Sequence, residues 1–131
     1  MFKVLPIQSK DTQKELCEKC GVVFDADLLA YAVSVGDEFA GICQFKLTDK
    51  GGEIYDIAPA LTKNDPDALF VMGRGALNFI DLCGVHSAYF LGETPTEETE
   101  RLIKAIGFKT TEDGYFVNLE GFFTDHCHDK K

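Results

Sequence analysis

The sequence predicts a single domain of the α+β class, built on a mixed β-sheet. With 131 residues, of which 45% are hydrophobic, the chain is long enough for one core and too short for two. Its middle third holds three strand-like runs joined by short turns, which favours an antiparallel meander. A long helical pattern then leads to another strand-like run, as expected of a crossover to a parallel strand. We expect residues 1–124 to form the domain and residues 125–131 to be a polar tail.

The N-terminal half predicts a strand, a helix and then the meander. Alternating apolar residues predict a first strand over residues 1–7. A short helix over residues 11–20 follows, since Thr12 and Glu15 have the spacing of a capping box and Gly21 offers a stop. Ser9 and Asp11 are alternative caps. The meander strands are expected at residues 28–35, 39–47 and 53–58.

The central helix and its following strand are the clearest elements of the second half. From Pro66 to Cys83, apolar residues recur with helical spacing and leave only a narrow polar stripe. This pattern predicts a largely buried helix that ends at Gly84. Residues 87–91 then predict a strand parallel to the one that precedes the helix.

The C-terminal part predicts a helix and a hairpin. Thr94 is expected to cap the helix, with Pro95 in its first turn and Glu97 reaching back to the cap. Gly107 would close this helix. A turn at residues 113–114 (Asp-Gly) would join the two hairpin strands, at residues 108–111 and 115–123.

Charge and cysteine content exclude several classes of function. The formal net charge is -9 and the acidic residues are scattered, which argues against nucleic-acid or anionic-membrane partners. The chain has neither a run of about 18 apolar residues nor a secretory signal at its start. An odd number of cysteines, five, favours reduced thiols. We therefore expect a cytoplasmic protein.

The cysteines also raise the question of a metal site. Cys17 and Cys20 form a CxxC pair, and residues 126–128 (His-Cys-His) add further ligand types for zinc. On the predicted helix, however, the two cysteines share a stripe with Leu16 that the helix would bury. The second half of a zinc knuckle is absent. We expect buried thiols and no metal, with a zinc-binding domain as a minor alternative.

Four stretches, spread over nearly the whole chain, carry a family resemblance. Residues 28–47, with Gly41 in an Ala-Gly-Ile-Cys context, are similar to the second and third strands of that family. Residues 57–59 (Ile-Ala-Pro) resemble its Val-x-Pro at the end of the fourth strand. Residues 77–85 resemble the end of its third helix, and residues 100–108 its C-terminal Leu-Tyr-Glu-x-x-Gly-Phe. With the order of the elements, these motifs resemble the GNAT family (GCN5-related N-acetyltransferases).

The resemblance implies an acyl-CoA-dependent N-acyltransferase that acts on a small amine or a protein amine. In this family the acyl-pantetheine arm lies between the fourth and fifth strands, which would place the backbone of Ile57 and Ala58 beside it. The diphosphate of acetyl-CoA binds N–H groups of a glycine-rich loop at the start of the central helix, where the helix N-terminus favours anions. By spacing from Gly84, this loop corresponds to Lys63, Asn64, Asp65, Ala68 and Leu69.

Two segments compete for the role of that phosphate loop. Residues 73–76 (Gly-Arg-Gly-Ala) match a glycine-rich loop by letters, but a loop there would leave too short a crossover helix. We expect Gly73 and Gly75 to be interior helix glycines that allow close packing, at about 1 kcal/mol each relative to Ala. At residues 63–69 both loop glycines are absent.

Acidic residues stand instead at the expected loop. Asp65 is placed to cap the helix, with Pro66 in the first turn and Asp67 behind it. Such a cap would use N–H groups that a diphosphate needs, and both carboxylates would repel the ligand. Lys63 would offset part of this repulsion. The sequence therefore predicts weakened or lost acetyl-CoA binding.

The catalytic residues implied by the resemblance are also incomplete. Ile103 stands where the family commonly has the Tyr that protonates the leaving thiolate. Candidates for the base are Glu53, Tyr55 and Asp56, and strict alternation places Glu53 and Tyr55 on one face of the strand and Asp56 on the other.

The acceptor side of the predicted fold also departs from the family. Residues 22–27 are too few for the family's second helix, so the acceptor site would be open or built differently, and a homodimer is one way to complete it. Two functions follow: a GNAT-type acyltransferase with weakened or lost activity, or a non-catalytic binding or assembly module on the same fold.

Overall fold

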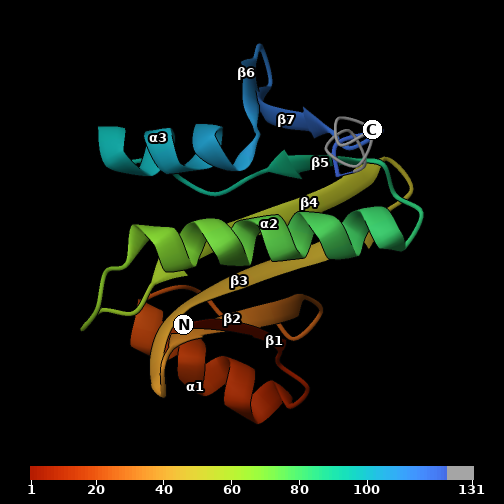
Figure 1. The fold of residues 1–131 in the computed structure, drawn as a ribbon. Coiled ribbons are helices and arrows are strands. Elements are labelled where there is room, and N and C mark those ends of the chain that lie inside the picture. The colour runs from red at the N-terminus through yellow and green to blue at the C-terminus, as the bar shows by residue number, and fades with distance from the viewer. Residues whose placement is uncertain (124–131) are drawn as a thin grey trace.

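A seven-stranded mixed sheet forms the centre of the protein, seen in a computed structural model that describes residues 1–123 (Figure 1). The strands are β1 (Phe2–Pro6), β2 (Leu29–Val35), β3 (Glu38–Thr48), β4 (Gly51–Pro59), β5 (Ser87–Phe90), β6 (Lys109–Thr111) and β7 (Gly114–Asn118), and the helices are α1 (Lys10–Cys20), α2 (Pro66–Leu82) and α3 (Glu97–Ile106). The predicted tail at residues 125–131 lies outside the described residues.

The strand order is β1-β2-β3-β4-β5-β7-β6. The first four strands pair antiparallel, β5 runs parallel to β4, and β7 returns antiparallel to β5. This topology confirms the predicted mixed sheet, with its meander, crossover helix and C-terminal hairpin.

Two predicted boundaries near the C-terminus are wrong. Thr96, not Thr94, caps α3, and its side-chain oxygen accepts the N–H of Thr99 at 3.1 Å. This choice places three glutamates in the first turn, where the helix dipole favours negative charge. β7 ends at Asn118, because the N–H of Phe122 bonds to the carbonyl of Leu119 and turns the chain away.

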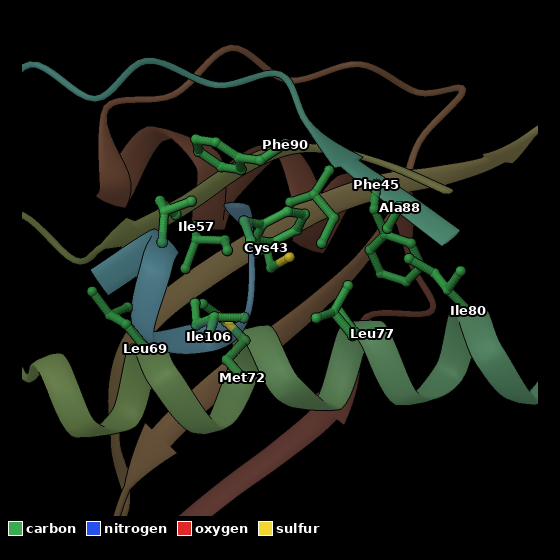
Figure 2. Close-up of a cluster of buried hydrophobic side chains, with 14 of the residues drawn as sticks. Cys43, Phe45, Ile57, Leu69, Met72, Leu77, Ile80, Ala88, Phe90 and Ile106 are labelled. Carbon is green, nitrogen blue, oxygen red and sulfur yellow. The ribbon is translucent and has the colours of Figure 1, made fainter. Parts of the chain in front are cut away.

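α2 lies across one face of the sheet and covers most of the core. Its apolar side chains point toward the strands, as Figure 2 shows for Leu69, Met72, Leu77 and Ile80. On the other face of the sheet, α1 covers a smaller cluster that includes Ile42, Cys17 and Cys20. Within residues 1–123, α2 and the other helices lack the length and hydrophobicity needed to cross a bilayer.

Both glycines lie inside α2, as predicted, but of the two only Gly73 allows a close approach, so the predicted packing role of Gly75 is wrong. A Cβ atom added at Gly73 would lie 2.6 Å from Cδ1 of Ile106, so this glycine lets α3 come close to α2. A Cβ atom at Gly75 would lie 3.4 Å from the nearest atom of Val4, an ordinary contact distance. The Arg74 side chain between them stacks on the ring of Phe122 and donates to the carbonyl of Ile106.

We expect Gly73→Ala and Gly75→Ala to have different effects on the stability of the protein. Gly75→Ala should stabilise the protein by up to about 1 kcal/mol, because alanine favours the helix and the site has room. Gly73→Ala should be about 1 to 3 kcal/mol less stable than Gly75→Ala, because the methyl group overpacks the contact with Ile106. Urea unfolding measures both, and equal effects would contradict the packing role of Gly73.

Candidate functional site

β4 and β5 pair over only a short length and then separate. Their register joins Gly52–Ile54 to Ala88–Phe90, and the last bond runs from the N–H of Leu91 to the carbonyl of Ile54 at 2.8 Å. β4 continues to Pro59, whereas β5 ends at Phe90. The second half of β4 therefore faces the chain that follows β5 across an opening.

A cavity of about 640 Å³ occupies this opening. One wall is the second half of β4, and the opposite wall is the chain that follows β5 into α3. The segment between α1 and β2 closes a third side. The lining residues that matter below are Val23, Asp25, Leu28, Gln44, Tyr55, Asp56, Ile57, Ala58, Phe90, Glu93, Pro95 and Thr99.

A β-bulge in β4 sets which side chains face the cavity. Gln44 pairs with Asp56 and the next residue, Phe45, pairs with Ile54, which leaves Tyr55 as the extra residue. Ile54 and Ile57 therefore both pack in the cluster under α2. Asp56 pairs with Gln44, and Glu53, to which Tyr55 is hydrogen-bonded, pairs with Lys46 on the same face of β3. The predicted placement of Asp56 on the opposite face from Tyr55 is therefore wrong, and both side chains line the cavity.

Asp56 is held by two hydrogen bonds from one residue of the neighbouring strand. The backbone N–H of Gln44 donates to Oδ1 at 2.9 Å, and its side-chain Nε2 donates to Oδ2 at 2.8 Å. Burial raises the pKa of Asp56 from 3.8 to about 6, although the two bonds from Gln44 act in the opposite direction. Such a carboxylate is ionised at pH 7 and close enough to neutrality to exchange protons.

Glu53 and Tyr55 interact with each other beside Asp56. The Tyr55 hydroxyl donates to Oε1 of Glu53 at 2.6 Å, and this bond, more than burial, raises the pKa of Tyr55. Nζ of Lys46 lies 4.0 Å from the same carboxylate oxygen. Tyr55 therefore keeps its proton at neutral pH, and Glu53 is already engaged. Of the three predicted base candidates, Asp56 has the environment that suits a base.

The predicted cofactor residues fall into two groups. Ile57 and Ala58 line the cavity. The other five lie away from it, around the start of α2. Nζ of Lys63 pairs with Oε1 of Glu38 at 3.3 Å, and the remaining members are exposed (Asn64), partly buried (Asp65) or buried (Ala68, Leu69).

The start of α2 is capped by its own carboxylate, as predicted. Asp65 is the N-cap, Pro66 begins the helix, and Oδ1 of Asp65 accepts the N–H of Ala68 at 3.1 Å. Asp67 adds a second carboxylate in the first turn. One of the free N–H groups that attract anions to a helix start is thus already bonded.

α3 presents a threonine to the cavity rather than an acid. Ile103, at the position of the family's tyrosine, is 1% exposed and packs in the core. One turn earlier on the same helix, Thr99 lines the cavity. Between α1 and β2 the structure has no helix, as the short segment predicts.

Cys17 and Cys20 are buried against the sheet. Burial, followed by the charge of Asp56, raises the pKa of Cys17 to about 11 and that of Cys20 to about 12. Both thiols therefore stay protonated at neutral pH, unlike reactive thiolates. Within residues 1–123, no group of three His, Cys, Asp or Glu side chains is placed to hold a metal ion. The tail residues of the zinc alternative, His126 to His128, lie outside the described part of the chain.

Comparison with solved structures identifies the fold. The chain matches the ribosomal-protein-S18-alanine N-acetyltransferase of Escherichia coli with a TM-score of 0.70 and 9% identity, over 91% of this chain and 94% of that chain. A protein of the GNAT family from Desulfovibrio desulfuricans gives 0.66 and 13%, over 91% and 99%. A Bacillus subtilis acetyltransferase in complex with CoA gives 0.65 and 16%, over 85% and 78%. The chain thus has the GNAT fold.

Sequence comparison adds no relative to these structures. The chain matches no protein-family model, and no curated protein sequence matches it.

Proposed function

We propose that this protein is a GNAT-type N-acyltransferase that binds acyl-CoA weakly and transfers the acyl group to a positively charged amine. The observation that carries this proposal is the opening between β4 and β5, with Asp56 on its wall. A partly buried carboxylate whose pKa is about 6 suits proton abstraction at neutral pH. Asp56 lies in the part of β4 that does not pair with β5, which supports this role.

The residues around the opening fit acyl-CoA at one end and not at the other. Beyond Ile54, β4 has no pairing with β5, so the backbone of Ile57 and Ala58 is available to a pantetheine arm. At the start of α2, the Asp65 carboxylate occupies an N–H group and would have to move before a diphosphate could bind. Acyl-CoA would supply the acyl group and the thiolate leaving group.

The charge of the cavity favours a cationic acceptor. Asp25, Asp56 and Glu93 line it from three different segments, and no Lys or Arg is among the lining residues of the described chain. These carboxylates would attract an ammonium group and repel an acceptor that carries its own carboxylate. Asp56 would accept the proton that the attacking nitrogen must lose. A small amine or a protein amine fits this description, whereas a homodimer and a cytoplasmic location remain predictions from the sequence.

A second candidate is a non-catalytic binding module on the same fold. Two observations favour it: the cap on α2 and the buried Ile103 in place of an acid. Incubation of the purified full chain with acetyl-CoA and a panel of diamines, peptides and amino acids distinguishes the two candidates. Thiol release that depends on amine supports the transferase, and its absence with every amine supports the binding module.

Removal of the acidic cap should improve CoA binding. We expect the double change Asp65→Gly, Asp67→Gly to lower the Kd for acetyl-CoA about 30-fold, since each of the two close carboxylates opposes the diphosphate by about 1 kcal/mol. Calorimetry gives the Kd, and the ligand-induced rise in melting temperature gives an independent check. Asp11→Gly, in the first turn of α1, controls for loss of an acidic residue elsewhere. An unchanged Kd in the double variant would show that the cap does not limit binding.

Asp56 should control the fall of kcat/KM at acidic pH, the acidic limb of the pH profile. The base must be ionised, so kcat/KM should rise with pH through about 6 and level off above it. Asp56→Asn should lower kcat/KM by about 10²-fold to 10⁴-fold and abolish this limb. Asp25→Asn, which neutralises another carboxylate of the cavity, should keep the limb. A limb that persists in Asp56→Asn would assign the base to another group.

A further inference from the structure

A chain of hydrogen-bonded side chains links Lys10, at the start of α1, to Asp56. Nζ of Lys10 donates to Oε1 of Gln13 at 3.1 Å, and Nε2 of Gln13 donates to Oε1 of Gln44 at 2.9 Å. Nε2 of Gln44 then donates to Asp56 at 2.8 Å. Both glutamines are 0% exposed, and they are the buried polar residues of the core within residues 1–123. Two such side chains are costly to bury unless their hydrogen bonds are satisfied.

The two ends of this chain fix the direction of every hydrogen bond. An ammonium group can only donate, so Oε1 of Gln13 must face Lys10 and its NH₂ group must face Gln44. Oε1 of Gln44 must then accept, which turns its NH₂ group toward Asp56. An ionised carboxylate only accepts, so it matches this arrangement. If a protonated Asp56 donated to Gln44, both side-chain amides would have to rotate. The NH₂ group of Gln13 would then face the ammonium group of Lys10, and two donors would meet.

The same amides hold the wall of the cavity. Gln44 Nε2 also donates to the carbonyl of Val23 at 2.8 Å, and Gln13 Nε2 lies 3.4 Å from the carbonyl of Leu28. Both carbonyls belong to the segment between α1 and β2 that lines the acceptor side. The position of this wall and the orientation of Asp56 therefore depend on the same two side chains.

We propose that Lys10, Gln13 and Gln44 form a positioning chain that keeps Asp56 ionised and aimed into the cavity. The chain acts through Asp56 and does not itself touch an acceptor. Its catalytic meaning rests on the proposed function, but its effect on the Asp56 carboxyl does not. Stabilisation of the ionised form by donated hydrogen bonds offsets part of the penalty that burial places on the charge.

Other ionisable groups also surround Asp56. Cys17 and Cys20 of α1 face it as protonated thiols, Tyr55 is its neighbour in β4, and the carboxylates of Asp25 and Glu93 line the same cavity. None of the lining groups within residues 1–123 is a Lys or Arg. Lys10 donates to Gln13 and to the carbonyl of Leu28 and is not a lining residue, so its removal separates the chain from these other groups.

NMR titration of the Asp56 carboxyl in the full chain, assigned with Asp56→Asn, tests this proposal. Gln44→Met should raise the pKa of Asp56 by about one pH unit, because it removes a donor to the charged form. Lys10→Met should raise the pKa by less, and Lys10→Arg should restore it, because arginine can only donate. In an active enzyme, Gln44→Met should move the acidic limb to higher pH while kcat recovers above it.

Two controls separate positioning from general effects. Lys14→Met removes a positive charge one turn along the exposed face of α1 and should leave the titration of Asp56 unchanged. Ile42→Val removes a methyl group from the face of β3 that carries Gln44, and it should also leave the titration of Asp56 unchanged. An unmoved pKa in Gln44→Met would overturn the proposal. If that variant does not fold, equal titrations in Lys10→Met and Lys14→Met would overturn it. A raised pKa without amine-dependent acyl transfer would support the chain and count against the proposed function.

Discussion

The extra residue in β4 is the constraint on which the site depends. β4 is hydrogen-bonded to β3 on both sides of Tyr55, so the bulge cannot slide along the strand. It returns Ile57 to the core under α2, where Ile54 already lies, and it turns Asp56 toward the opening beside Tyr55. Since β5 stops where the bulge begins, the edge of β4 beyond its pairing with β5 and the partly buried carboxylate meet at one place.

Asp56 in turn links β4 and β3 to α1. Gln44, its partner on β3, reaches through the amide of Gln13 to α1, which has only a small apolar cluster beneath it. Part of what holds α1 and the following segment in place is thus polar. Because a buried amide without partners is costly, this polar contact specifies one arrangement of the acceptor wall more sharply than apolar packing would.

The elements of the fold could be predicted from the sequence because their signals are local. Alternation and helical spacing predict the strands and helices seen in residues 1–123, and four consecutive residues predict the cap at Asp65, whereas the predicted cap at Thr94 is wrong. The bulge could not be predicted, because the extra residue in β4 is defined only by how β4 pairs with β3. Alternation therefore places Asp56 on the wrong face.

Of the other site residues, Gln44 does carry a signal in the sequence. It is a polar residue in the apolar run from Phe39 to Phe45. Glu93 and Thr99 come to the site only through tertiary folding.

Backbone amide NMR of the full chain, titrated with CoA, tests the central claim most directly. We expect the largest chemical-shift changes in the second half of β4 and in residues 90–93, on the two sides of the opening. The amides at the start of α2 should respond strongly only after Asp65 is replaced. Changes centred on the wild-type start of α2, or no change near the opening at millimolar CoA, would contradict an acyl-CoA site between β4 and β5.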